Sequence, residues 1–190
     1  MTTGVIHGRF QVFHNDHLAY LLAGRDRCDH LVVGITNPDP WSTRRDPADP
    51  ARSDPAANPL TYYERHRILQ AVLLDEGLDP AAFSIVPFPV NFPERWAAYV
   101  PLDAVFFLTI YDAWGERKLR LFQDRGLRAE VLWRRPPARK GLSASRVRAL
   151  IREGGDWEPL VPPAAARVMK ALGIPERLRG GVDTHSAPTL

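Results

Sequence analysis

The feature that most constrains the fold is a regular alternation of short apolar segments with longer amphipathic ones. Runs rich in β-branched and aromatic residues predict strands at 4–6, 30–36, 83–87, 103–110 and 128–133. Apolar residues at helical spacing predict helices at 16–27, 61–76, 93–99, 113–125, 143–152 and 163–172. The strands are almost continuously apolar, as in a sheet that is buried on both faces. The alternation therefore predicts an α/β fold with a doubly wound parallel sheet and helices on both of its faces.

Length and composition limit the classes of protein to which the chain can belong. A chain of 190 residues is long enough for one domain with a complete core. A net charge of +3 does not require a nucleic-acid partner, and the single cysteine excludes an intramolecular disulfide. The N-terminus lacks the apolar core of a signal peptide, and no apolar run approaches the ~20 residues that cross a bilayer. We expect a cytoplasmic protein with no nucleic-acid or membrane partner.

Two segments fall outside the alternating pattern. The segment 37–59 is rich in Pro, Asp and Arg, has few apolar residues and is long for a loop. It predicts a long flexible loop, either a lid over a site or a solvated surface loop. Residues 179–190 have the composition of a disordered tail, so we expect one domain over 1–178.

The turn after the first expected strand, His7–His17 (HGRFQVFHNDH), carries the strongest chemical signal. In a doubly wound sheet, ligands bind beyond the carboxyl ends of the strands, where this turn lies. Gly8 allows a ligand to approach the backbone, and Arg9 can bind an anion. His14 and His17 lie one turn apart at the start of a helix, where the dipole favours a phosphate. Triphosphate binding, metal ligation by the two histidines and a structural helix cap all remain open on this evidence.

Two separate motifs carry a resemblance to a known family. The turn His7–His17 resembles the G-R-x-Q-P-x-H-x-G-H signature of the nucleotidyltransferase superfamily. The segment Ser143–Arg148 (SASRVR) resembles its second signature, I-S-G-T-x-V-R. Residues 58–65 and 145–162 also resemble segments of archaeal-type nicotinamide-nucleotide adenylyltransferases, so the similarity covers most of 4–178 outside the loop.

The resemblance implies a Rossmann-like nucleotidyltransferase fold and a reaction. Such enzymes transfer a nucleoside monophosphate from an NTP to a phosphate-bearing acceptor, release pyrophosphate and use Mg²⁺ held by the phosphates. It implies catalytic roles for Arg9, His14 and His17, and no metal ligand supplied by the protein. It assigns nucleotide binding to Gly8, Phe10, Gln11, Ser143, Ser145 and Arg148. Because relatives form multimers, it also implies a homo-oligomer.

The acceptor side is less well defined by the resemblance. Candidate acceptor-binding residues are Asn91, Phe92, Trp96 and Asp112. In the family, a tryptophan in the region of Trp96 stacks on the pyridine ring of the nicotinamide nucleotide, and stacking on a flat base suits an indole. The alternative is that Phe92 and Trp96 belong to the core.

Several positions depart from the family pattern. Val12 replaces a proline, Asp16 replaces the glycine between the two histidines, and Ala144 and Ser145 replace Gly-Thr. The carboxylate of Asp16 could point away, cap the helix or help to hold Mg²⁺. The segment 109–115 (TIYDAWG) replaces a glycine-containing S-G-N-P. These departures lie around the acceptor and the mouth of the site.

The departures leave more than one function open. The first is an adenylyltransferase that joins AMP from ATP to nicotinamide mononucleotide and forms NAD. The second is a cytidylyltransferase that joins CMP from CTP to a small phosphonate or phosphate in a specialised pathway. The third is a non-enzymatic nucleotide sensor, which would have no need of the two histidines.

Overall fold

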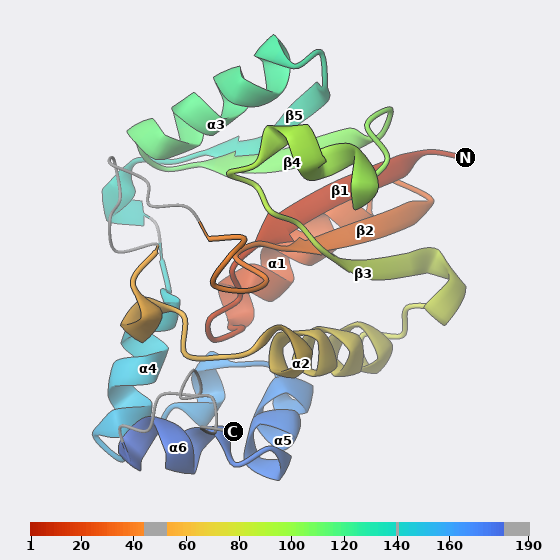
Figure 1. The fold of residues 1–190 in the computed structure, drawn as a ribbon. Helices are drawn as coiled ribbons and strands as arrows, with labels where there is room; N and C mark the ends of the chain where they lie inside the picture. Colours follow the sequence, from red (N-terminus) through yellow and green to blue (C-terminus); the bar gives the residue numbers. More distant parts are fainter. Residues whose placement is uncertain (44–52, 140, 181–190) are drawn as a thin grey trace, which may run out of the picture.

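The computed structural model describes residues 1–43, 53–139 and 141–180 (Figure 1). Its strands form one parallel sheet in the order β3-β2-β1-β4-β5. The strands are β1 (Thr3–Gly8), β2 (His30–Ile35), β3 (Phe83–Pro87), β4 (Val105–Ile110) and β5 (Arg128–Arg134). The chain winds outward in one direction from β1 and then in the other from β4, so the topological switch lies between these two strands. The prediction of a doubly wound parallel sheet is confirmed.

The α-helices agree with the expected segments except at two places, and several short 3₁₀ helices were not expected. The α-helices are α1 (Asn15–Arg25), α2 (Tyr62–Asp75), α3 (Ala113–Asp124), α4 (Ala144–Arg152), α5 (Pro163–Ala171) and α6 (Ile174–Gly180). The short 3₁₀ helices are η2 (Pro55–Ala57), η3 (Pro80–Ala82), η4 (Pro93–Ala98), η5 (Pro137–Arg139) and η6 (Glu158–Leu160). The helix expected at 93–99 is thus a 3₁₀ helix.

The second difference is α6, which extends the ordered chain into the predicted tail. Ile174 and Leu178 lie one helical turn apart, and both are buried in the core, so burial holds this short helix in place. The helix ends at Gly180, close to the boundary that the sequence predicts at 178. Residues 181–190 of the predicted tail and 44–52 of the predicted loop lie outside the described residues.

Helices cover both faces of the sheet (Figure 1). Ile6 packs in a core with Leu21 of α1 and Leu69 of α2. Its neighbour Val5 packs in a second core with Phe122 of α3. Successive residues of a strand point to opposite faces, so β1 supplies side chains to both layers in turn. This alternation decides which layer each residue at the end of β1 faces.

The start of α2 forms a capping box. Thr61 Oγ1 accepts a hydrogen bond from the Glu64 N–H at 3.2 Å, and Glu64 Oε2 accepts one from the Thr61 N–H at 2.8 Å. The Glu64 carboxylate also accepts two hydrogen bonds from the Arg177 guanidinium of α6, at 2.6 and 2.9 Å. One carboxylate therefore both caps α2 and anchors α6.

The next residue of α2, Arg65, holds the turns that surround the end of β1. Its buried guanidinium donates to the carbonyl oxygens of Arg9 at 3.0 Å, Thr36 at 2.8 Å and Asn37 at 2.8 Å. Burial lowers the pKa of Arg65 to about 10, so the group still carries its charge at neutral pH. A charged fork with several carbonyl partners fixes the turns after β1 and β2 relative to α2.

We predict that Arg65→Met lowers the free energy of unfolding by about 2–4 kcal/mol, because several buried carbonyl oxygens lose their donor. Arg67→Met is the matched control, since Arg67 lies on the exposed side of the same helix and donates only to the Tyr63 hydroxyl in the described contacts. The control should change stability by less than about 0.5 kcal/mol. Urea unfolding of both variants measures the difference, and equal losses would contradict the role given to Arg65.

Candidate active site

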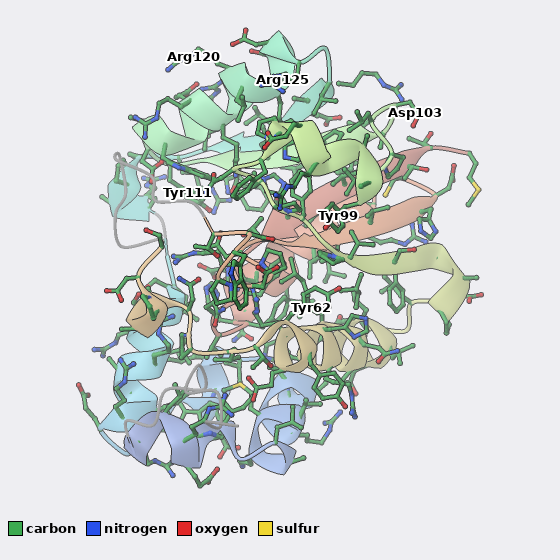
Figure 2. The ribbon with its side chains drawn as sticks, viewed as in Figure 1. Tyr62, Tyr99, Asp103, Tyr111, Arg120 and Arg125 are labelled. Atoms are coloured by element: carbon green, nitrogen blue, oxygen red, sulfur yellow. The ribbon has the colours of Figure 1, made fainter. Side chains whose placement is uncertain are left out.

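A cavity of about 360 Å³ opens at the carboxyl ends of β1 and β4, where the sheet switches direction. Its lining comes from the turn after β1 and the start of α1, from the ends of β2 and β4, and from the starts of α3 and α4. Figure 2 labels one lining residue, Tyr111, at this side of the sheet beneath α3.

Most of the candidate residues from the sequence lie together around this cavity. The residues that line it are Gly8, Arg9, Phe10, Gln11, His14, His17, Asn91, Asp112, Ser143 and Ser145. The three that do not are Phe92, Trp96 and Arg148. The two sequence motifs, more than a hundred residues apart in the chain, therefore meet at one site.

His14 and His17 form a stacked pair at the N-terminus of α1. Their ring centroids lie 3.6 Å apart, and His14 is the N-cap residue. The His14 backbone N–H donates to Nδ1 of His17 at 3.4 Å, so the neutral His17 ring carries its proton on Nε2. Burial lowers the pKa of His14 to about 4. Burial, then His14 and Arg9, lower the pKa of His17 well below its ordinary value. Both rings are neutral N–H donors at pH 7 before a ligand binds.

Phe10 packs against the His17 ring of this pair. Its backbone adopts a left-handed conformation with φ of 52°, and its side chain is buried. The Phe10 ring packs edge-on against His17, with centroids 5.2 Å apart, and Phe13 packs on the same imidazole at 5.5 Å. The aromatic residues of the first motif therefore hold the His17 ring in one orientation.

Arg148 lies outside the cavity lining and joins the second motif to the first motif. Its buried guanidinium donates to the Gln11 backbone carbonyl and, at 3.2 Å, to Ser145 Oγ. The side-chain amide of Gln11 is in turn committed to Leu60, donating to its carbonyl at 3.0 Å and accepting from its N–H at 2.8 Å. The resemblance implies phosphate contacts for Arg148 and Gln11. In the structure their polar groups connect the segments that line the site.

Asp16, the unexpected carboxylate, makes a second connection between the two motifs. Its Oδ2 accepts a hydrogen bond from the Leu142 N–H at 2.7 Å, just before α4. Gly141 has a left-handed φ of 70°, and a Cβ at this position would lie 2.3 Å from Asp16 Oδ2. The glycine permits the close approach that the carboxylate needs. Asp16 thus binds the segment before α4, and the N-cap of its own helix is His14.

Buried polar atoms without a partner concentrate at this site. Among the described residues they are Nδ1 and Nε2 of His7, Nδ1 of His14 and Nε of Arg148. His7 and His14 line the cavity, and Arg148 bonds to two residues that do. Buried polar atoms in native proteins nearly always have partners. Their concentration here indicates a site built for a polar ligand.

Trp96 and Phe92 lie in the core outside this cavity. Trp96 is 2% exposed and packs edge-to-face on Phe122, with centroids 5.1 Å apart. Its indole N–H donates to the Pro89 carbonyl at 3.3 Å. Phe92, the N-cap residue of η4, is also buried. The structure supports the core alternative for both rings, and it does not place Trp96 where it could stack on an acceptor.

Sequence reasoning gave no role to several residues that line the cavity: His7, Tyr111, Trp114, Lys118 and Trp133. His7 is a polar residue at the end of an apolar strand, and Tyr111 directly follows β4, so the switch-point rule could have identified both. Trp114 and Lys118 lie one turn apart on α3, with the Lys118 ammonium 4.5 Å from the indole centroid. Trp133 donates to the Tyr111 hydroxyl at 2.7 Å, a contact between strands β4 and β5 that has no sequence signal.

Comparisons with known proteins identify relatives of this chain. No family model matches the chain. A phosphonoformate cytidylyltransferase of Streptomyces viridochromogenes is 55% identical over 177 residues, covering 93% of this chain and 95% of that protein. A nicotinamide-nucleotide adenylyltransferase of Ignicoccus hospitalis is 33% identical over 174 residues, covering 90% and 93%. This chain belongs to the nucleotidyltransferase family.

Solved structures share the fold of this nucleotidyltransferase. A bifunctional NMN adenylyltransferase/ADP ribose pyrophosphatase of Francisella tularensis, in complex with AMP and a manganese ion, matches with a TM-score of 0.65 and 14% identity. The match covers 94% of this chain and 52% of that one. A putative nicotinate-nucleotide adenylyltransferase of Vibrio parahaemolyticus matches with a TM-score of 0.56 and 13% identity, over 94% and 96%. At such low identity these matches concern the fold alone.

The lowered pKa of His14 predicts that this nucleotidyltransferase loses stability in mild acid. The unfolded chain binds a proton on this histidine below pH 6.5, whereas the folded chain does so only below about pH 4. The free energy of unfolding should therefore fall as the pH drops through this window, by about 2 kcal/mol at pH 5 from His14 alone. His7 and His17 act in the same direction.

Urea unfolding at pH 7.5 and pH 5 measures this loss in the wild type and in His14→Gln. The variant should lose less stability between the two pH values, because glutamine does not titrate. An equal loss in both proteins would contradict a buried, neutral His14.

Proposed function

We propose that this nucleotidyltransferase is a cytidylyltransferase that transfers CMP from CTP to a small phosphonate of the phosphonoformate class. The relative of that activity is 55% identical along almost the whole chain. The observation in the structure that carries the choice of acceptor is the place of Trp96. Its ring is held in the core, so it does not offer the cavity a face for a pyridine ring. An acceptor without an aromatic ring fits that arrangement.

The second candidate is transfer of AMP from ATP to nicotinamide mononucleotide. Curated relatives at about 30% identity carry that activity in their names, and the nucleotide-binding motifs are shared. The base of the NTP is the main difference between the two candidates on the nucleotide side.

The proposed reaction needs little acid–base chemistry from the protein. A phosphonate oxygen of the acceptor is already an anionic nucleophile. It forms a bond to the α-phosphorus of CTP, while the bond from that phosphorus to the bridging oxygen breaks and pyrophosphate leaves with the electron pair. Catalysis of such a transfer consists of positioning the reactants and stabilising charge on the phosphoryl oxygens.

The residues of the two motifs supply that stabilisation in our proposal. The neutral His14 and His17 donate N–H groups to the α- and β-phosphates at the N-terminus of α1, and Arg9 adds a positive charge. Ser143 caps α4 by accepting from the Arg146 N–H at 3.3 Å. The first residues of α4 line the cavity, so the N-terminus of this helix lies at the site. Two helix N-termini at one cavity favour a triphosphate.

We infer that Mg²⁺ enters with the triphosphate. The described residues contain no group of three or more His, Cys, Asp or Glu side chains that could hold a metal ion. Asp16 is bonded to Leu142, and Asp112 Oδ1 caps α3 by accepting from the Gly115 N–H at 2.9 Å. Mg²⁺ retains water and phosphate ligands readily, so phosphate oxygens suffice to bind it.

We further infer a cytoplasmic homo-oligomer, as the sequence leads us to expect. Nucleoside triphosphates, the proposed donors, are cytoplasmic metabolites. Within the part of the chain that the structure describes, no helix combines the length and the apolar character that a bilayer crossing demands.

Pyrophosphate release tests the proposed function directly. ATP, CTP, GTP and UTP are each offered with Mg²⁺ and with phosphonoformate, methylphosphonate or nicotinamide mononucleotide. We expect turnover with CTP and phosphonoformate to exceed every other pair by at least about a hundredfold in kcat/KM. Turnover confined to ATP and nicotinamide mononucleotide would overturn the proposal in favour of the second candidate.

We predict that His17→Ala lowers kcat by about a hundredfold or more, because it removes a donor aimed at the phosphates. His66→Ala is the control: this histidine lies on α2, packs on Tyr62 and does not line the cavity. The control should keep kcat within about twofold. Near-normal turnover by His17→Ala would exclude its catalytic role.

A further inference from the structure

His7 faces the layer of the molecule opposite to the phosphate-binding histidines. It follows Ile6, which packs under α1, so the alternation along β1 turns His7 toward α3. Its ring lies 5.4 Å from the rings of both Phe88 and Phe122, measured between centroids. His7 is 5% exposed and lines the cavity. The imidazole thus forms part of the cavity wall on the α3 side.

Neither ring nitrogen of His7 has a hydrogen-bond partner among the described residues. An aliphatic side chain would fill this aromatic surrounding without leaving a polar atom unpaired. Burial, and then the charge of Lys118, lower the pKa of His7 well below its ordinary value, so the ring is neutral. A neutral imidazole in an apolar wall presents one N–H donor and one acceptor to whatever occupies the cavity.

Lys118 brings a positive charge to the same compartment. It lies on α3, is half-buried and lines the cavity beside Trp114. Asp112 lines this side as well, but its carboxylate caps the N-terminus of α3, whose dipole stabilises that negative charge. The cavity therefore has donors for an anion on both sides of the end of β1: His14 and His17 on the α1 side, and His7 with Lys118 on the α3 side.

We propose that His7 and Lys118 form a subsite for a second anionic group of the acceptor, a carboxylate attached next to its phosphonate. The inference rests on the proposed function, in which the phosphonate must reach the α-phosphorus near His17. The opposite end of a small acceptor then faces the α3 side. A carboxylate there would accept the His7 N–H and pair with the ammonium, giving a charge-assisted hydrogen bond and an ion pair in an apolar wall.

The subsite makes the enzyme selective for acceptors that carry the carboxylate. A site with a buried donor discriminates strongly against an analogue that lacks the matching group, because the donor is then left unpaired. A phosphonate with a methyl group in place of the carboxylate should therefore bind weakly, although its nucleophilic oxygen is unchanged.

Calorimetric binding of phosphonoformate and of methylphosphonate to the full chain, without nucleotide, tests the subsite. We expect the wild type to bind phosphonoformate at least about 30-fold more tightly than methylphosphonate. In His7→Leu and in Lys118→Met this preference should fall below about threefold, whereas His7→Gln, which keeps an N–H donor, should retain part of it. Arg120→Met is the matched control, because Arg120 is exposed on the outer side of α3 (Figure 2), and it should keep the full preference.

The melting temperature of the ligand-free variants distinguishes a loss of binding from a loss of folding. His7→Leu should raise the melting temperature of the ligand-free protein by about 2–4 °C, since it removes unpaired buried polar atoms. If it fails to fold, Lys118→Met still decides the question. A wild type without the preference, or variants that keep it, would overturn the subsite.

The two proposals fail in different ways. Turnover of phosphonoformate with CTP, with unchanged acceptor KM in His7→Leu and Lys118→Met, would leave the proposed function intact and refute the subsite. Conversely, a carboxylate preference that both variants lose, in an enzyme that uses only ATP, would support the subsite and refute the proposed donor.

Discussion

The site depends on the contact between the Arg148 guanidinium and the Gln11 backbone carbonyl. This bond joins α4, which begins within the second motif, to the turn that carries the first motif. Burial lowers the pKa of Arg148 to about 10, so it remains charged and a strong donor at neutral pH. The Gln11 amide continues the connection to Leu60, and Asp16 adds a parallel link to Leu142. These links help to hold the N-termini of α1 and α4 at one cavity.

The fold could be predicted because its signals are local and repeated. Each strand is a short apolar run. The helix α2 is indicated by Thr61 and Glu64 at its start and by its apolar stripe. The sequence did not predict α6, because only Ile174 and Leu178 mark it and their burial depends on how α6 packs against α4 and α5. Short elements of this kind are held by tertiary packing, which a local pattern does not contain.

The meeting of the two motifs at one cavity could be expected from the sequence, whereas the packing around the expected acceptor residues could not. The first motif combines a glycine, two histidines and an expected helix start within a few residues, and this combination is visible in His7–His17. Whether Trp96 faces a ligand or the core depends on how η4 packs against Phe122, which no spacing reveals. His7 and Lys118 line one cavity because His7 points to the face of the sheet that α3 covers. The chain thus keeps the two motifs of the family and departs from the family pattern around the expected acceptor residues.

A crystal structure with Mg²⁺, a non-hydrolysable CTP analogue and phosphonoformate would test the central claim most directly. We predict that the triphosphate lies between the N-termini of α1 and α4, next to His14 and His17. The phosphonate should lie near the α-phosphorus, with the carboxylate against His7 and Lys118. A complex in which the base or the ribose occupies the His7 side, or in which the phosphates lie away from the two histidines, would contradict this prediction.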